Sequence, residues 1–294
     1  MLSATIMGGL GNQLFIIFAT LAYGIQNNIK VVFPYTYHLY DRHTYWETLL
    51  DEIRIFTLAN ESNNDYHTAS FHQYSEPRFR YDVIPDFGGI DITFHGYFQS
   101  YKYFEKVQST IYSMIKLSRK QEHIREKYSN YLGKTGPTDI LSIHFRLGDY
   151  KYKRNYHPIM NYEYFEGALD YIMLQRSNRE NAVRVLYFCE QEDNAYVGSK
   201  IALLNQKYPG VEFLKVDDTI EDYEQVLIMS CCDHHIIPNS TFSWWGAYLN
   251  QSNSKIVCYP SVWFNAHFES YEDIIPPTWI KIVAEPTHHD LPLV

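Results

Sequence analysis

Residues 138–260 alternate between short apolar runs and longer amphipathic stretches, and this alternation restricts the fold of the chain more than any other feature. Strands that alternate with helices form parallel sheets with helices on both faces. Such sheets bind ligands at the carboxyl ends of their strands, so functional residues are expected just after Phe145, Phe188 and Pro238. The expected strands are 140–145, 183–188, 211–214, 235–237 and 255–260, and the expected helices are 162–175, 195–208, 219–232 and a short one through Trp245. Thr219 and Asp222 have the spacing of a capping box at the start of the third helix.

The first half of the chain gives a weaker pattern. A helix is expected over 12–28, strands at 31–34 and 91–98, and one or two helices over 103–131, whereas 35–90 is irregular. Residues 133–138, rich in Gly, Thr and Pro, form the best candidate linker. At about 150 residues per domain, 294 residues suggest two domains. We therefore predict an α/β domain over 1–136, a Rossmann-like domain over 137–265, and a tail over 266–294 that packs back on the body.

Composition and charge exclude several classes of protein. Apolar residues make up 46% of the chain and charged residues 20%, which is typical of a globular enzyme and excludes extensive disorder. The net charge of −9 argues against nucleic acid as a partner. No stretch of about 20 apolar residues predicts a membrane span, and no signal peptide is visible. The four cysteines form no Cys-x-x-Cys motif, so we expect them to be reduced and buried in a cytoplasmic protein.

Three glycines occupy the first predicted turn between strand and helix. Gly8, Gly9 and Gly11 would let the backbone approach an anion at the N-terminus of the following helix. The turn is not a dinucleotide fingerprint, because Leu14 stands where the third glycine of that motif belongs. A tight turn needed only for packing explains the glycines equally well.

Two further segments follow predicted strands. In the first, His144 and Arg146 lie on one side of an extended chain, and Arg146 suits bidentate binding of a phosphate. An ion pair between Arg146 and Asp149 is the alternative, and both can hold together. In the second, Asn239, Ser240 and Thr241 precede a helix, where the hydroxyls would cap the helix or hold a diphosphate. The chain has no Asp-x-Asp motif, so we expect no bound metal.

These motifs occur in a recognisable order. Segments 9–15, 96–104, 144–150 and 239–247 together resemble the α-1,2-fucosyltransferases of glycosyltransferase family 11. The resemblance implies a GT-B-like α/β fold with two Rossmann-type halves facing a central cleft, the first on the acceptor side and the second binding the nucleotide sugar. It implies inverting transfer of L-fucose from GDP-β-L-fucose to a galactoside hydroxyl in α-1,2 linkage, without metal or other cofactor. Animal members carry a membrane anchor, so this chain resembles the soluble bacterial or viral members.

The resemblance also assigns roles to residues. The stretches implied to bind the donor are the glycine turn, the end of the strand at 144, the residue after Cys189 and the turn at 239–243. In this sequence they supply Gly9, Gly11, Asn12, Gln13, His144, Arg146, Glu190, Asn239, Ser240, Thr241, Phe242 and Ser243. Tyr97 and Gln99 are implied on the acceptor side. Arg146 would stabilise the leaving diphosphate, with Asp149 or else His157 as general base; orienting Arg146 is the alternative role of Asp149.

Two positions depart from the family pattern. Leu147 stands where the family usually has a second arginine, and Glu190 follows a strand after which paired aspartates are usual. Leu147 either weakens donor binding or marks a pocket repacked for another donor. Alternative functions are therefore a transferase of the same fold with another nucleotide sugar or acceptor, or a non-catalytic relative that binds sugar or nucleotide. The expected partners are a GDP-sugar and a glycan; peripheral contact with a membrane stays open, and no oligomeric state is predicted.

Overall fold

The fold is known from a computed structural model that describes residues 1–39, 42–63, 67–265 and 271–285. The described residues divide into two compact units: 1–120 with 271–276, and 121–265 with 277–285. The first division thus lies near residue 120 and not at the linker around residue 136. The cause is visible at Gln121, whose buried side chain donates hydrogen bonds to the Ser230 hydroxyl and the Leu249 carbonyl of the second unit.

The second unit contains a six-stranded sheet whose neighbouring strands all run parallel, in the order β11-β10-β9-β6-β7-β8. Its strands are β6 (Thr138–His144), β7 (Ala182–Phe188), β8 (Val211–Lys215), β9 (His234–Ile236), β10 (Val257–Pro260) and β11 (Ile280–Ile282). If β6 is counted as strand 1 and β11 as strand 6, the order read from the β8 edge is 3-2-1-4-5-6, the order of a Rossmann fold. The doubly wound α/β arrangement expected from the sequence is confirmed. The edge strand β11 was not predicted as a strand.

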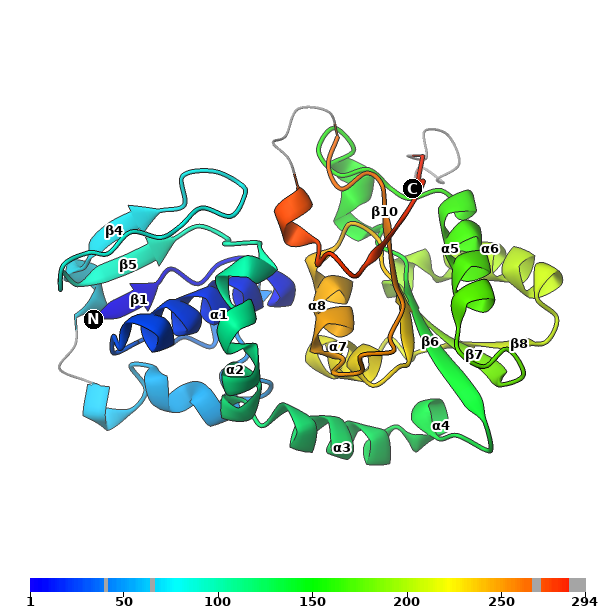
Figure 1. The fold of residues 1–294 in the computed structure, drawn as a ribbon, viewed down its shortest axis with the longest axis horizontal. Helices are drawn as coiled ribbons and strands as arrows, with labels where there is room; N and C mark the ends of the chain where they lie inside the picture. The colour runs from blue at the N-terminus through cyan, green and yellow to red at the C-terminus, as the bar shows by residue number, and fades with distance from the viewer. Residues whose placement is uncertain (40–41, 64–66, 266–270, 286–294) are drawn as a thin grey trace. The chain divides into compact units, whose positions relative to one another are not determined.

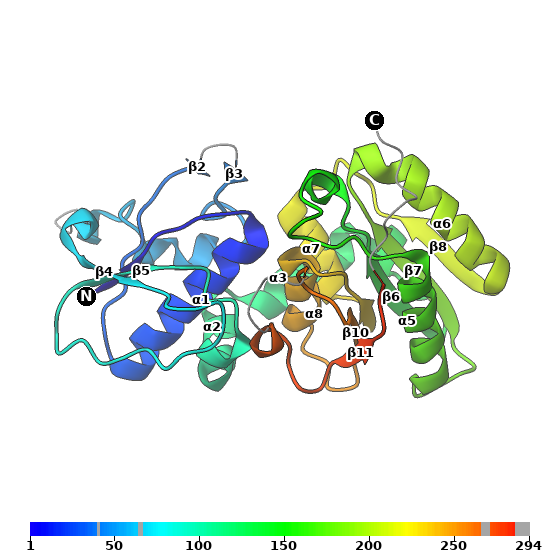
Figure 2. The same ribbon diagram turned by 90° about the horizontal axis from the view of Figure 1, so that it is seen from above.

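Helices cover both faces of this sheet. α5 and α6 lie on one face, and α7 and α8 lie on the other (Figure 2). Their bounds are α5 (Tyr162–Gln175), α6 (Asn194–Lys207), α7 (Asp222–Ser230) and α8 (Thr241–Leu249). The expected capping box is wrong: α7 begins at Asp222 after Glu221, and the Thr219 hydroxyl donates to the Asp217 carboxylate, 2.7 Å away. α8 is longer than expected because its apolar residues stay buried through Leu249.

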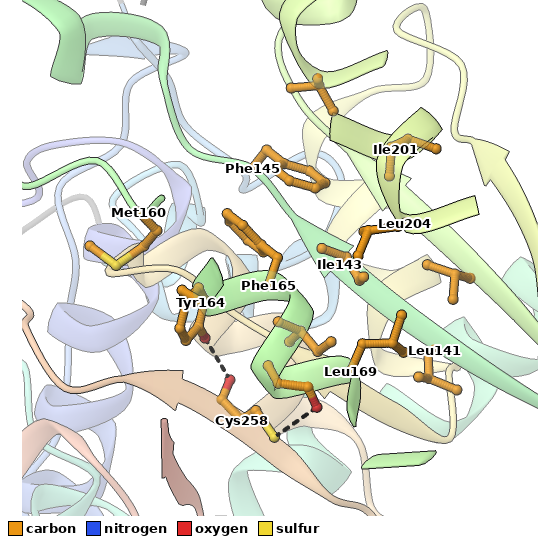
Figure 3. Close-up of a cluster of buried hydrophobic side chains, with 14 of the residues drawn as sticks. Leu141, Ile143, Phe145, Met160, Tyr164, Phe165, Leu169, Ile201, Leu204 and Cys258 are labelled. Carbon is orange, nitrogen blue, oxygen red and sulfur yellow. Dashed lines mark hydrogen bonds between the residues drawn. The ribbon is translucent and has the colours of Figure 1, made fainter. Parts of the chain in front are cut away.

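A cluster of buried side chains between α5, α6 and the sheet fixes the end of β6 (Figure 3). Phe145 packs on Phe165 of α5 with ring centroids 4.2 Å apart. The Tyr164 hydroxyl donates to the Cys258 carbonyl of β10 at 3.2 Å, so α5 is also tied to the sheet by a hydrogen bond. Burial of each such side chain contributes about 1.5–3 kcal/mol. All four cysteines are free and buried, as expected.

The first unit has a smaller parallel sheet in which β1 (Leu2–Ala4), β5 (Ile92–His95) and β4 (His72–Ser75) lie side by side (Figure 1). Of the strand expected at 31–34, the structure shows only isolated parallel bridges, from Val31 to Leu2 and from Phe33 to Thr57. α1 (Leu10–Asn27) follows β1, and most of its residues are buried. The carboxyl ends of β1, β5 and β4 therefore meet at one edge of this sheet.

The remaining elements are short. β2 (His38–Leu39) and β3 (Arg42–His43) form an antiparallel pair. The helices expected over 103–131 are α2 (Gln108–Met114), α3 (Leu117–Lys127) and α4 (Ser129–Leu132). None of the helices in the described ranges combines the length and the apolar character that a bilayer span requires.

Candidate active site

The loops after β6, β7 and β9 meet at the carboxyl edge of the second unit's sheet. β6 pairs with β7 on one side and with β9 on the other, and between β6 and β9 the strand order reverses. Ligands of such sheets bind in the crevice at this switch point. The segments that follow β6 and β9 are in contact: the Tyr150 hydroxyl donates to the Asn239 carbonyl at 3.0 Å, and the His144 and Phe242 rings lie 5.4 Å apart.

Arg146 lies at the centre of this arrangement. Its guanidinium forms ion pairs with Asp149 and with Glu190, and it lies 4.9 Å from the centroid of the Tyr150 ring. Asp149 also accepts a hydrogen bond from Lys153, 2.8 Å away. The ion pair offered as an alternative by the sequence is therefore present, and Glu190 adds a second one. These carboxylates hold the guanidinium fork in place, and an anion that binds Arg146 competes with them.

A buried anchor fixes the loop that carries Arg146. The Gly148 N–H donates to the buried Asp193 carboxylate at 3.0 Å, and the Lys151 ammonium lies 2.8 Å from the same carboxylate. Gly148 has a φ of +35°, and a Cβ there would lie 2.3 Å from Glu190 Oε1, so glycine suits this position. From the sequence Lys151 was noted only as one cation of a basic loop, and its pairing with Asp193 was missed because it joins segments about 40 residues apart.

The carboxylates of Glu190, Glu192 and Asp193 lie within 4.8 Å of one another, a spacing that could hold a cation. The positive charge next to them comes from side chains: Arg146 pairs with Glu190, and Lys151 pairs with Glu192 and Asp193. The cluster is thus explained by the ion pairs that hold the Arg146 loop.

Three polar atoms around this crevice are buried and have no hydrogen-bond partner among the described residues: His144 Nδ1, His157 Nδ1 and Asn239 Oδ1. Burial, with the charge of Arg146 added, lowers the pKa of His144 to about 3, so its imidazole is neutral at neutral pH. The Asn239 amide nitrogen donates to the Trp263 carbonyl at 3.0 Å, which fixes the orientation of that side chain. An unpartnered buried polar atom costs about 1–3 kcal/mol. A polar ligand that reached these atoms would recover that cost.

The N-terminus of α8 faces the same loops. Ser240 is its N-cap residue, and Thr241 is its first residue. The expected Ser240 cap is wrong, since within the described part of the chain this hydroxyl makes no capping hydrogen bond. Ser243 is buried, and its hydroxyl lies 3.5 Å from the Ser240 carbonyl. A helix N-terminus carries partial positive charge, which favours an anion.

The two residues predicted as general base differ in their surroundings. Asp149 is engaged by Arg146 and Lys153. The His157 ring stacks on the Tyr150 ring, with centroids 4.2 Å apart and an interplanar angle of 12°. Burial lowers the pKa of His157, which favours its neutral form. Both residues therefore belong to the group around Arg146.

The predicted residues of the first unit gather at the carboxyl ends of β1 and β5. Gly9 caps α1, Gly11 is buried in its first turn, and the Asn12 side chain accepts a hydrogen bond from Gln99 at 2.9 Å. Tyr97 is about one-third exposed.

The buried Gln13 side chain holds the glycine turn. It donates to the carbonyls of Gly8 at 2.9 Å and of His43 at 2.8 Å. Gly8 has a φ of +76°, and a Cβ there would lie 2.7 Å from the Asn12 amide nitrogen. Packing alone therefore accounts for Gly8 and Gln13. A Cβ on Gly9 would meet no described atom within 4 Å.

Comparison with known proteins gives the family. The family model described as glycosyl transferase family 11 matches residues 48–283. The O-antigen biosynthesis glycosyltransferase WbnK of Escherichia coli is 30% identical over 149 residues, which cover 49% of this chain and 45% of that protein. An alpha-1,2-colitosyltransferase of Escherichia coli is 28% identical over 153 residues, covering 49% and 48%. A galactoside 2-alpha-L-fucosyltransferase of Caenorhabditis elegans is 25% identical over 193 residues, covering 63% and 51%. The chain thus spans about half the length of the curated relatives it matches.

Solved structures of glycosyltransferases align with this chain at TM-scores below 0.5. A glycosyl transferase family 9 protein of Veillonella parvula aligns with a TM-score of 0.49 and 8% identity, over 98% of this chain and 87% of that one. A variant of Arabidopsis thaliana FUT1 in complex with GDP aligns with a TM-score of 0.48 and 10% identity, over 87% and 69%. The family model covers most of the chain, including all six strands of the second unit's sheet, and the chain belongs to glycosyl transferase family 11.

Proposed function

We propose that this protein is an inverting glycosyltransferase that moves L-fucose from GDP-β-L-fucose to a galactoside hydroxyl and forms an α-1,2 linkage. Membership of glycosyl transferase family 11 supports glycosyl transfer, and the relative named as a galactoside 2-alpha-L-fucosyltransferase supports this donor and linkage. One observation carries the proposal: Arg146 lies at the switch point of the sheet, close to two unpartnered buried polar atoms, His144 Nδ1 and Asn239 Oδ1. This combination suits a polar, anionic ligand.

The proposed reaction needs charge stabilisation at the leaving group. Cleavage of the bond between the sugar and the β-phosphate leaves negative charge on the diphosphate and positive character on the sugar ring. Arg146 offers a planar bidentate donor to that charge, and the N-terminus of α8 adds partial positive charge. Because burial lowers the pKa of His144 to about 3, its neutral imidazole would offer one N–H donor to the diphosphate at neutral pH. Asn12 and the glycine turn at Gly9 stay proposed donor contacts, and Tyr97 and Gln99 stay proposed acceptor contacts.

Asp149 and Glu190 are proposed to serve the donor in different ways. A carboxylate paired with two cations is a weak base, so the contacts of Asp149 with Arg146 and Lys153 favour a role in positioning Arg146. Glu190 is about half exposed at the end of β7, and Arg146 is its one ion-pair partner among the described residues. A diphosphate on Arg146 would release Glu190, whose carboxylate would then accept hydrogen bonds from the N1–H and N2–H₂ groups of guanine. Adenine and uracil do not offer that pair of donors.

We expect GDP to bind at least about tenfold more tightly than UDP or ADP, a difference of about 1.4 kcal/mol. Removal of divalent cations should leave its affinity unchanged, because Arg146 and Lys151 already neutralise the acidic cluster near the site. Calorimetric titrations with each nucleotide, with and without EDTA, measure both effects. Equal affinity for UDP, or loss of GDP binding in EDTA, would contradict the proposal.

A second donor is favoured by a specific observation. One relative is named as an alpha-1,2-colitosyltransferase, and Leu147 replaces an arginine usual in the family. The alternative function is therefore transfer of another sugar, such as colitose, by the same site. A screen that measures nucleotide release from GDP- and UDP-sugars in the presence of galactosides separates the two. If nucleotide is released from a colitosyl donor but not from GDP-fucose, the transferred sugar is colitose and not fucose.

A further inference from the structure

A carboxylate that the sequence did not single out lies at the sheet edge of the first unit. Glu76 follows β4, and its Oε2 accepts hydrogen bonds from the backbone N–H groups of Tyr97 at 2.9 Å and Phe98 at 3.0 Å, which follow β5. Phe98 has a φ of +49°, an uncommon value for a residue with a side chain. At Gly96, where φ is +155°, a Cβ would lie 2.3 Å from Glu76 Cβ. The backbone after β5 is therefore wrapped closely around this side chain.

The second oxygen of Glu76 is presented differently. Within the described ranges Oε1 has no hydrogen-bond partner. The structure has several buried polar atoms without a partner, and Oε1 is not one of them. One oxygen is thus anchored by two backbone donors, while the other has no partner among the described residues. Tyr97, proposed to contact the acceptor, supplies one of those donors, and Gln99 lies two residues further along. The carboxylate has a fixed position and one free acceptor atom.

We propose that Glu76 is the general base that takes the proton from the acceptor hydroxyl, an inference that rests on the proposed transferase function. The hydroxyl oxygen forms a bond to the anomeric carbon of the donor as the bond from that carbon to the β-phosphate oxygen breaks. The electron pair of the broken bond stays on the departing GDP. The hydroxyl proton passes to Glu76 Oε1 and then to solvent, so one glycoside, one GDP and one proton are formed.

The surroundings of Glu76 suit proton transfer near neutral pH. Burial raises its pKa to about 7; the Phe98 and Tyr97 N–H groups act in the opposite direction, and the negative charge of Asp82 adds to the rise. Asp82 is itself paired with Arg78 at 2.6 Å. The nearby hydroxyls of Tyr74 and Tyr103 stay neutral, since burial raises the pKa of each. A base with a pKa close to the working pH is the most effective. Asp149, by contrast, is engaged by two cations.

The test compares Glu76→Gln with the unaltered protein, using the donor and galactoside found by the donor screen. The glutamine amide oxygen still accepts the two N–H bonds, so folding should be retained. We expect kcat to fall about a hundredfold, within the range for loss of a general base. The affinity for GDP should not change. The unaltered protein should lose activity as pH falls through about 7, whereas the residual activity of Glu76→Gln should lack this acid limb. Glu61→Gln, which removes a carboxylate elsewhere in the same unit, is the matched control and should behave like the unaltered protein.

A second variant keeps the test decisive if Glu76→Gln does not fold. Because the charge of Asp82 raises the pKa of Glu76, Asp82→Asn should move the acid limb to lower pH. Three results would each overturn the assignment. The first is an acid limb of the pH profile that stays in place in Asp82→Asn, and the second is a Glu76→Gln variant with normal kcat and a normal acid limb. The third is loss of the acid limb in Asp149→Asn instead. If the unaltered protein transfers no sugar from any donor, the proposed function fails, and the role of Glu76 as a base fails with it. If transfer is normal and only the Glu76 results disagree, the base assignment alone fails.

Discussion

Replacement of Arg146 by alanine is expected to lower kcat/KM about a thousandfold while the protein stays folded. Truncating one partner of a close charge pair costs about 2–5 kcal/mol, and roughly 4 kcal/mol corresponds to this loss. Two physical effects add together: the leaving diphosphate loses its bidentate donor, and Glu190 loses its pairing with Arg146 while Asp149 keeps Lys153 alone of the two cations described above. The side chain is 23% exposed and lies outside the apolar cluster, so its loss should change the melting temperature little.

Donor-dependent steady-state kinetics and a melting curve measure both parts of this prediction. Arg146→Lys should recover less than about tenfold, because an ammonium does not reproduce the planar fork. Lys153→Ala is the matched control: it removes an exposed cation from the same loop, and the loss of a surface ion pair should change the rate by less than about fivefold. Near-normal turnover of Arg146→Ala would refute the assignment.

Introduction of arginine at position 147 is expected to destabilise the second unit by roughly 3–5 kcal/mol, the cost of a buried charge without a partner. The sequence left open whether this change would restore a donor contact. Its surroundings favour a packing role, because Leu147 is only 3% exposed and belongs to the same apolar cluster as Phe145, Ile159 and Phe165. An arginine here must either bury its charge or leave the cluster. We infer that Leu147 serves packing in this chain.

Thermal melting and GDP titration of Leu147→Arg test this expectation. A loss of this size lowers the melting temperature by roughly 10 °C for a unit of this length. Leu147→Met, which nearly conserves volume, should cost less than about 1.5 kcal/mol and serves as the control. An unchanged melting temperature together with tighter GDP binding would show that position 147 faces the donor.

Most of the second unit could be predicted from the sequence, because β6–β10 and α5–α8 follow regular periodicities. The strands that were missed are short and lie at edges. β4 has no apolar run, since His72, Gln73 and Ser75 are exposed, and so it gives no strand pattern. β11 has only three residues and is recognisable only by its pairing with β10.

The site was predictable only in part, for a similar reason. A parallel sheet collects the residues that follow its strands, so Arg146, Glu190 and Asn239 could be expected at one edge of the second unit. Glu76 could not be found in this way, because its importance depends on N–H groups 21 and 22 residues further along the chain. The burial of Leu147 was equally invisible, because a single leucine in a polar loop does not reveal which side of the backbone is covered.

The return of residues 271–276 to the first unit has a consequence for biosynthesis. Asp273 accepts hydrogen bonds from the Tyr81 N–H at 3.1 Å and from the Lys102 ammonium, and its carbonyl accepts one from Ser100 at 2.6 Å. The chain then returns to the second unit, where β11 completes the sheet beside β10. Domains often mature one after another as they leave the ribosome. Here the returning segment of the first unit and the edge strand of the second both lie within residues 271–282, so a nascent chain stalled before residue 271 would leave both units incomplete.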